Sequence, residues 1–188
     1  MYSLLIDTHD KDVLLALYEN GKIRDKIEKE SKMRHSEITM PSLVELINRN
    51  GLRISDIDEI LTVVGPGSFT GVRIGVVIAK TIAYLLKKPI KCITSVDLLY
   101  YSNDLSEGIY RINENKGFFV SQYNGSSLKC ESIKYYSNDD YFKLYGSTNV
   151  FSDVCLDLEK IYLYASKLEN TDPHLVNPVY VKQIEALK

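Results

Sequence analysis

Hydrophobic residues and polar turns alternate over the first thirty residues in a pattern that predicts three β-strands. Apolar runs at residues 4–6 and 13–17 are separated by the polar segment 8–11, which is typical of two antiparallel strands. The dipeptide Asn20-Gly21 follows and suits a type I′ hairpin turn, because both turn positions require a positive φ angle. Residues 22–30 alternate between charged and apolar side chains, so we expect a half-exposed third strand there.

A helix and a buried strand are predicted next. Ser36 is the expected N-cap of this helix and Gly51 its stop. Residues 60–64 are apolar and mostly β-branched, which indicates a central strand buried on both faces. The apolar stripe of the helix consists of Met40, Leu43, Val44 and Ile47.

A second helix, over residues 71–86, carries apolar side chains in nearly every direction around its axis. A helix of this kind is buried on more than one side. One side can pack on the chain's own sheet, and the other requires a second layer or another protein. Gly71 and Gly75 would let a partner helix approach closely. Together with the stripe of the first helix, the residues expected at a partner interface are Met40, Leu43, Val44, Ile47, Gly71, Gly75, Val76, Val77, Ala79, Ile82 and Ala83. The alternative is that these side chains belong to the core.

One more strand and helix are predicted before the composition of the chain changes at about residue 103. Residues 90–95 predict a strand that ends at Ser95, the expected cap of a helix over 96–103. Beyond that helix the chain is rich in Tyr, Asn and Ser, and its strand-like runs predict a small β-meander. We expect a closing helix within 152–168 and an extended tail over 177–183.

Composition supports a folded protein of one generous domain or two small ones. The chain has 188 residues, of which 45% are apolar, enough to bury a core. Because the amino-acid composition changes near residue 103, we predict an N-terminal domain over residues 1–102 and a small C-terminal domain over 103–188. The formal net charge of −2 provides no basic field that could hold nucleic acid unaided.

Cysteine usage and the apolar runs indicate the compartment. Cys92, Cys130 and Cys155 form no CxxC pair, which argues against a disulfide framework and a zinc knuckle. No basic leader precedes the first strand, and no apolar run reaches the roughly 18 residues of a membrane span. We therefore expect a cytoplasmic protein without membrane contact.

One glycine-rich segment, the motif loop, follows the buried strand: Gly65, Pro66, Gly67, Ser68, Phe69, Thr70, Gly71 and Arg73. A Walker loop requires Lys directly after its last glycine, where this chain has Val72. A dinucleotide fingerprint is missed by one residue of glycine spacing. What remains is a strand-to-helix turn with Ser68 or Thr70 as helix cap, whose helix amides could receive an anion. Such turns need no ligand, so both interpretations stay open.

The run GPGSFTGVRIG resembles the signature of the bacterial TsaB (YeaZ) family, which is the accessory subunit of the tRNA threonylcarbamoyladenosine machinery. Residues 4–8 resemble the family's opening strand, residues 34–47 its His-Ser-Glu helix and residues 177–182 its C-terminal tail. The resemblance implies an α/β, actin-like or Hsp70-like ATPase (ribonuclease H-like) fold, a mixed sheet with packed helices. It is faint over residues 103–172, which implies a reduced second domain.

The resemblance also implies a function in association. Family members are non-catalytic scaffolds that bind and stabilise the paralogous catalytic subunit TsaD, which the ATPase TsaE joins. TsaD transfers the threonylcarbamoyl group to tRNA, so contact with tRNA is expected only through the complex. A homodimer that uses the same apolar surface would compete with the TsaD complex. No cofactor, metal or catalytic residue is expected.

Two enzymatic alternatives follow from the wider fold family: a glycoprotease-like metallopeptidase and an actin-fold nucleotide-binding enzyme. Metal binding in TsaD uses a His-x-x-x-His pair, whereas His9, His35 and His174 are not at that spacing. A nucleotide site would have to use Asp7 and Thr8, which are followed directly by His9 and Asp10 where a phosphate loop would have glycines.

Two interpretations stay open for each of three residues, Asp7, His35 and Arg73. Asp7 at a strand end could hold magnesium or cap a turn. His35 could act in catalysis, but Ser36 and Glu37 beside it on a helix cannot face it as a triad requires, which favours a capping role. Arg73 could bind a phosphate or pair with a carboxylate.

Overall fold

The computed structural model describes residues 1–32, 34–125, 127–130, 132–146, 150–152 and 155–181. A five-stranded sheet forms its first half, in the order β3-β2-β1-β4-β5. Its strands are β1 (Tyr2–Asp7), β2 (Asp12–Glu19), β3 (Lys22–Glu30), β4 (Glu59–Val63) and β5 (Ile90–Ile93). The first three strands are antiparallel, whereas β4 runs parallel to β1 and to β5.

The N-terminal meander is confirmed. Asn20 and Gly21 have φ angles of 51° and 84°, which are the positive values that a type I′ turn needs. The predicted central strand is also confirmed, because all five residues of β4 are buried.

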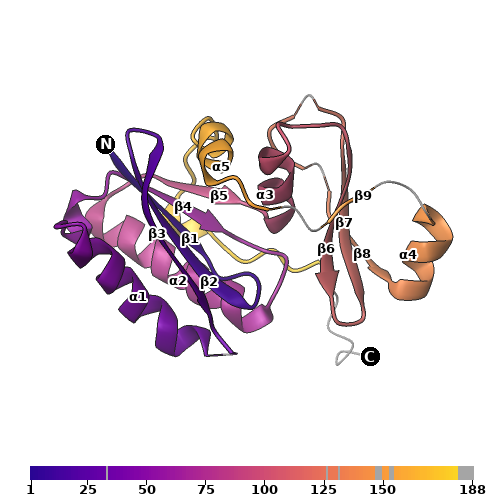
Figure 1. Ribbon diagram of the computed structural model, residues 1–188, viewed down its shortest axis with the longest axis horizontal. Helices are drawn as coiled ribbons and strands as arrows, with labels where there is room; N and C mark the ends of the chain where they lie inside the picture. The colour runs from indigo at the N-terminus through magenta and orange to yellow at the C-terminus, as the bar shows by residue number, and fades with distance from the viewer. Residues whose placement is uncertain (33, 126, 131, 147–149, 153–154, 182–188) are drawn as a thin grey trace.

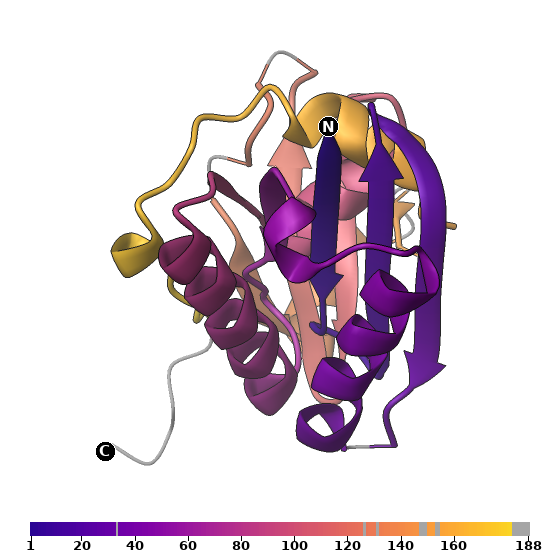
Figure 2. The ribbon, with the colours of Figure 1, turned by 90° about the vertical axis from the view of Figure 1, so that its left-hand side faces the viewer.

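Two helices cover one face of this sheet (Figures 1 and 2): α1 (His35–Arg49) and α2 (Phe69–Leu86). Their inward side chains form a core with Leu4, Ile6 and Ile60 of the sheet. The expected cap of α1 at Ser36 is wrong, because the helix begins one residue earlier, with Arg34 in the cap position and no side-chain cap bond.

The other face of the sheet is covered by α3 (Ser95–Ser102) and α5 (Leu158–Ala165). The predicted cap of α3 at Ser95 is wrong. Thr94 is the cap, because its side chain accepts from the Asp97 N–H while Asp97 accepts from the Thr94 N–H. Ser95 Oγ instead donates to the Pro66 carbonyl at 2.6 Å, which ties α3 to the motif loop.

A second sheet has the order β8-β7-β6-β9. Its strands are β6 (Gly108–Glu114), β7 (Gly117–Tyr123), β8 (Lys134–Ser137) and β9 (Val150–Phe151). The first three form the predicted meander. Helix α4 (Asn138–Tyr145) was missed, and it lies at the opposite end of the molecule from α1 (Figure 1). The sequence contains a helix-start signal there. The Ser137 side chain accepts a hydrogen bond from the Asp140 N–H as the N-cap, and Asp139 and Asp140 lie in the first turn.

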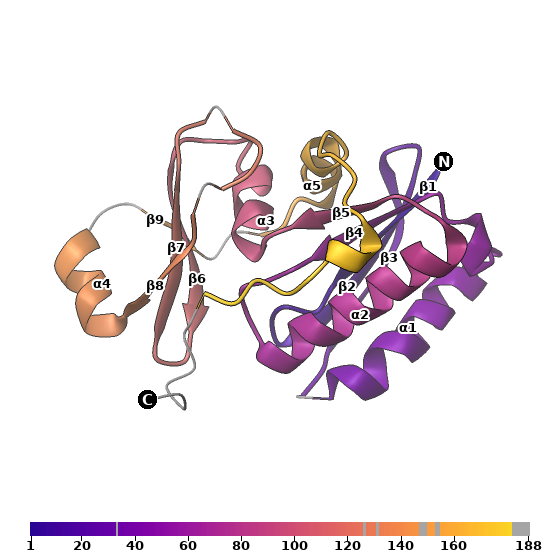
Figure 3. The same cartoon turned by 180° about the vertical axis from the view of Figure 1, so that it is seen from behind.

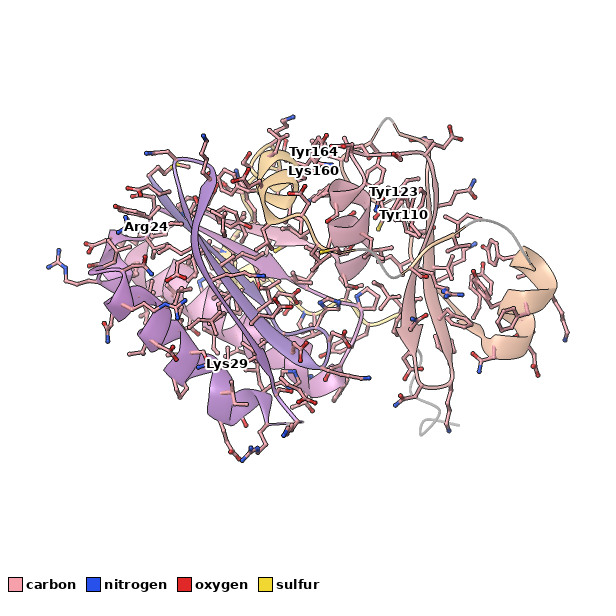
Figure 4. The ribbon with its side chains drawn as sticks, in the orientation of Figure 1. Arg24, Lys29, Tyr110, Tyr123, Lys160 and Tyr164 are labelled. Atoms are coloured by element: carbon pink, nitrogen blue, oxygen red, sulfur yellow. The ribbon has the colours of Figure 1, made fainter. Side chains whose placement is uncertain are left out.

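Tyrosines join the two sheets. Tyr100 of α3 stacks on Tyr123 at 3.8 Å between ring centroids and meets Tyr110 edge-on at 5.4 Å. Figure 4 shows Tyr110 and Tyr123 on the second sheet beside α3. Because these rings share one core with Leu5 and Leu61 of the first sheet, the two sheets are packed together rather than linked by a tether.

The chain then returns to the first sheet. Tyr162 of α5 lies 4.8 Å from the Tyr18 ring. A short 3-10 helix, η2 (Pro173–Leu175), follows, and the segment after it, residues 176–181, we call the strap. Figure 3 shows η2 and the strap, in yellow, beside α2. The predicted closing helix is confirmed over α5, and residues 182–183 of the predicted tail lie outside the described residues. The division of the chain at residue 102 stays a prediction.

This arrangement confirms the predicted α/β fold class, a mixed sheet with packed helices. Among the described helices, α2 alone has the length and composition to cross a membrane, with 18 residues and a mean hydropathy of 1.6, contrary to the expectation that no segment would. Core helices of soluble proteins pass the same test, and 33% of α2 is buried in this chain. Val77 and Leu85 are among its apolar side chains that stay exposed.

Candidate functional site: the motif loop and the helix face

The motif loop joins β4 to α2 and packs on the turn that follows β1. Ser68 is the helix cap, as one of the two predicted candidates, and its Oγ accepts from the Gly71 N–H at 3.1 Å. The Ser68 N–H itself donates to the carbonyl of His9 at 2.7 Å. The helix N-terminus is therefore turned toward a backbone carbonyl of the chain's own β1–β2 turn.

The glycines of this loop permit that close approach. A Cβ atom at Gly67 would overlap the His9 carbonyl, and one at Gly71 would overlap the Thr8 carbonyl. At Gly75 a Cβ atom would overlap Oγ1 of Thr8. The prediction that Gly71 and Gly75 receive a partner helix is therefore corrected: both face the end of β1, which leaves no room for another helix.

Asp7 and Thr8, the positions considered for a cofactor, are occupied by protein contacts. Asp7 Oδ1 accepts from the His9 backbone N–H at 3.0 Å and lies 2.7 Å from His9 Nδ1. Thr8 Oγ1 donates to the Gly71 carbonyl at 2.7 Å. Burial alone lowers the pKa of His9, but the charge of Asp7 and the hydrogen bond to it outweigh burial, so the pKa of His9 lies above its usual value.

A nucleotide, which the fold family implies, does not fit these residues. A phosphate cradle needs free backbone N–H groups and glycines without close neighbours. Here the glycines are filled by the Thr8 and His9 carbonyls, and Asp7 is engaged by His9. The motif loop is a close-packed turn rather than a phosphate site.

The other histidines also have structural partners. His35 Nε2 lies 2.8 Å from the carbonyl of Asp10, and its ring lies 3.2 Å from Ser31 Oγ. It therefore fixes the start of α1 to the β1–β2 turn. The His174 ring meets Tyr84 edge-on at 4.8 Å. Within the described part of the chain no group of His, Cys, Asp and Glu residues could hold a metal ion.

Arg73 is held by an aromatic pair that the sequence analysis missed. Its Nε donates to the Tyr180 hydroxyl at 2.6 Å, and its Cζ lies 3.7 Å from the Phe69 ring centroid. Tyr180 belongs to the strap, which is anchored by a 2.8 Å hydrogen bond from the Val179 N–H to the Val64 carbonyl. No spacing rule joins residues 107 positions apart, so the sequence contained no local signal for this contact.

Most residues expected at a partner interface lie in the core. The buried ones are Leu43, Ile47, Gly71, Gly75, Val76, Ala79 and Ala83, and Ile82 is half-buried against the same core. A side chain without accessible surface cannot contact a partner, so the interface prediction is corrected for the buried residues. It stays a prediction for Met40, Val44, Val77 and Ile82.

We call four exposed aliphatic side chains of α1 and α2 the helix face: Met40, Val44, Val77 and Leu85, which are 45%, 50%, 57% and 69% exposed. Phe69 and Tyr84 of α2 are also exposed, but their rings contact Tyr180 and His174. Leu85 was not predicted, although it follows Val77 by eight residues and so repeats on the same side of the helix. On α1, Glu45 points to β3, where its carboxylate lies 2.7 Å from Lys29 Nζ. Figure 4 labels Lys29 between β3 and α1.

Helical geometry places Met40 and Val44 on one flank of α1. Arg49 also reaches β3, through Asp25 at 2.6 Å, so this flank of α1 faces the sheet edge. Met40 and Val44 lie on the opposite flank of the helix, which is the side toward α2. Since α1 and α2 pack against each other, the four exposed side chains lie on two neighbouring helices.

A hollow lies elsewhere on the molecule. It has a volume of about 790 Å³ and opens between β3 and the start of α5. Its lining includes Ile23, Asp25, Cys155 and Glu159. It shares no residue with the motif loop or the helix face.

Comparison with known proteins gives consistent matches. A family model described as TsaD, tRNA N6-adenosine threonylcarbamoyltransferase, matches residues 26–112. The tRNA threonylcarbamoyladenosine biosynthesis protein TsaB of Bacillus subtilis is 36% identical over 99 residues, which cover 53% of this chain but only 43% of that protein. The TsaB of Escherichia coli is 34% identical over 83 residues, which cover 44% of this chain and 36% of that protein.

Full-length similarity is found at lower identity. An uncharacterised protein of Mycoplasma genitalium, MG208, is 26% identical over 192 residues, covering 96% of this chain and 95% of that one. A solved structure of YeaZ from Pseudomonas aeruginosa superimposes with a TM-score of 0.72 at 16% identity, covering 95% of this chain and 99% of that one. The structures thus share one fold over nearly their whole length.

Proposed function

The chain belongs to the TsaB (YeaZ) family, and from this premise we propose that it is a non-catalytic scaffold subunit of the tRNA threonylcarbamoyladenosine modification complex. In this role it binds and stabilises the catalytic subunit TsaD, and TsaE joins them. Contact with tRNA occurs only through the complex.

The observation that carries the proposal is the helix face. Large apolar side chains exposed on neighbouring elements are a feature of protein interaction sites. Met40 and Val44 are such side chains on α1, and Val77 and Leu85 on α2. No described segment of the chain covers them.

TsaD is a partner with matching architecture. The segment that matches the TsaD family model, residues 26–112, includes both helices of the helix face. We therefore expect TsaD to contain a corresponding helix pair, and two such pairs can pack as ridges into grooves.

The chemistry of the motif loop supports a non-catalytic role. Asp7 Oδ1 is held by His9, and Thr8 Oγ1 donates to the Gly71 carbonyl, so both atoms beside the loop already have protein partners. We find no observation that favours the peptidase or nucleotide-binding alternative.

The experiment that tests the proposal mixes the purified chain with TsaD of the same organism and measures mass by size exclusion with light scattering. We expect a stable mixed complex without ATP or tRNA. A chain that elutes only as a homodimer, with TsaD separate even when TsaE and ATP are added, would contradict the proposal.

A further inference from the structure

Arg73 is an exposed cation fixed in one orientation at the rim of the helix face. Its guanidinium lies over the Phe69 ring at 3.7 Å and over the Tyr180 ring at 5.4 Å from the centroids. The hydrogen bond from Nε to Tyr180 fixes the plane of the group. Arginine side chains usually lose rotamer freedom on binding, and here part of that loss has already occurred in the free chain.

The rest of the guanidinium has no partner among the described residues. Only Nε makes a hydrogen bond, and no described carboxylate lies within ion-pair distance of Arg73. An oriented Arg fork recognises a planar oxyanion through two parallel hydrogen bonds. The two terminal amino groups of Arg73 are thus available to such a group.

The helix places this cation beside the apolar surface. Arg73 and Val77 are four residues apart on α2, so their side chains are neighbours one turn apart on the same side. Val77 is 57% exposed. A protein that covers Val77 therefore comes within reach of Arg73.

We propose that Arg73 is a specificity-determining residue of the helix face, which pairs with a carboxylate that the partner protein places beside its own apolar contact. This inference rests on the proposed function, since it assumes that the helix face is the docking surface. It adds the chemistry that the partner must present: an apolar helix surface with Asp or Glu at the rim.

A second copy of the chain fits this requirement poorly. Helix α2 has no acidic residue anywhere between Phe69 and Leu86, so an α2–α2 contact would give Arg73 no carboxylate. On α1, Glu45 is already held by Lys29 at 2.7 Å, and Glu37 lies 3.7 Å from Arg34. A different protein is therefore favoured over a homodimer.

An RNA phosphate is also disfavoured. Binding to a phosphate backbone uses several cations along a track. The nearest basic side chain along α2, Lys80, is occupied by the carbonyl of Val176 at 2.9 Å. Arg73 is surrounded by Phe69, Val77 and Tyr180, which suits a protein contact.

The test compares Arg73→Glu with a charge reversal away from the helix face, Lys116→Glu, which lies in the turn between β6 and β7. The dissociation constant for TsaD is measured by titration calorimetry, with thermal unfolding of each variant as the folding control. We expect Arg73→Glu to weaken binding by about tenfold or more, because it replaces an ion pair by like-charge repulsion, and Arg73→Lys to show an intermediate loss. Lys116→Glu should bind as the wild type.

Three outcomes separate this inference from the proposed function. If Val77→Asp abolishes binding while Arg73→Glu binds as the wild type, the helix face is the docking surface and the role of Arg73 is wrong. If Arg73→Glu leaves TsaD binding intact but weakens binding of tRNA to the assembled complex, the Arg73 guanidinium binds an RNA phosphate and the inference is wrong. Restoration of Arg73→Glu binding by an acidic-to-Lys substitution in TsaD would confirm the pair.

Discussion

His9 lies against Asp7, with 2.7 Å between Nδ1 and Oδ1 and with only 11% and 5% of the two side chains exposed. The contact closes the end of β1, at the turn on which the motif loop packs. Because His9 holds Asp7 and the Thr8 and His9 carbonyls lie against Gly71 and Gly67, the end of β1 is packed by the chain's own groups.

Removal of His9 should destabilise the fold. In His9→Ala the buried carboxylate of Asp7 loses its side-chain partner, and a hydrogen bond to a charged group contributes about 2 kcal/mol. We expect a loss of that size in the free energy of unfolding, measured by urea titration below pH 6. An exposed control, His174→Ala, should change it by less than about 0.5 kcal/mol.

The effect of His9 should depend on pH in a defined direction. In the unfolded chain His9 has a pKa of about 6.5, and in the folded chain its pKa is raised. A raised pKa adds stability that is complete below the unfolded value and is lost as pH rises through the folded value. Asp7 and Asp10 are the charges that raise it. The stability gap between the wild type and His9→Gln should therefore shrink as pH rises from below 6.5; a gap that grows would contradict the ion pair.

Glycines 71 and 75 should respond differently to the same second-site change. Gly75→Ala overlaps the side chain of Thr8, whereas Gly71→Ala overlaps its backbone carbonyl. Each should cost about 1–3 kcal/mol of unfolding free energy through overpacking. Thr8→Ala removes the first overlap but not the second.

A double-mutant cycle measures this difference. Thr8→Ala should rescue part of the loss in Gly75→Ala and none of the loss in Gly71→Ala. Thr81→Ala, at an exposed position of the same helix, is the control. Equal rescue of both glycine variants would show that the packing against β1 is not as described.

Asp97 should be required for stable packing of the second sheet against the first. It is 1% exposed, and its Oδ1 accepts from the Tyr123 hydroxyl at 2.7 Å and from the Cys130 N–H at 3.1 Å. Burial, and then the charge of Asp97, raises the pKa of Tyr123 far above its usual value. Asp97→Ala should cost more than about 3 kcal/mol, since several bonds to a charged acceptor are lost.

The control for Asp97 is Asp139→Ala, at an exposed position in the first turn of α4. It should lose only about 0.5 kcal/mol as a helix-dipole effect. Denaturant unfolding followed by tyrosine fluorescence reports on both variants. Equal stability of the two variants would mean that the Asp97 network does not hold the sheets together.

Nucleotide should not stabilise the chain. A ligand at about a hundred times its dissociation constant adds about 2.7 kcal/mol to the unfolding free energy. Because the motif loop is packed against Thr8 and His9, we expect no shift in Tm with ATP and Mg²⁺. A dose-dependent rise in Tm would contradict the interpretation of the loop as a close-packed turn.

Local sequence signals predicted much of the first sheet. The Asn20-Gly21 turn and the apolar run of β4 each depend on neighbours in the sequence, and Ser68 as a cap follows from its position before an apolar helix. Both predicted caps that failed lie close to the true cap: Ser36 is two residues after Arg34, and Ser95 is one residue after Thr94. Helix boundaries read from sequence are commonly off by one or two residues.

The interface residues could not be resolved from periodicity. An apolar side chain has the same pattern whether its own sheet or another protein covers it, so Val76 and Val77 were indistinguishable; the structure buries the first and exposes the second. The contacts of Gly71 and Gly75 with Thr8, and the contact of Arg73 with Tyr180, join segments that are distant in the sequence. Such contacts have no period in the sequence and require the fold.

The measurement that tests the central claim most directly is the dissociation constant between TsaD and Val77→Asp. Val77 is 57% exposed, and Leu163 on α5 is 50% exposed but outside the helix face, so Leu163→Asp is a matched control. Val77→Asp should keep the wild-type Tm and lose TsaD binding by at least about a hundredfold, because a charge is buried in an apolar contact; Leu163→Asp should bind as the wild type. Wild-type affinity of Val77→Asp, or an equal loss in both variants, would contradict the assignment of the helix face as the docking surface.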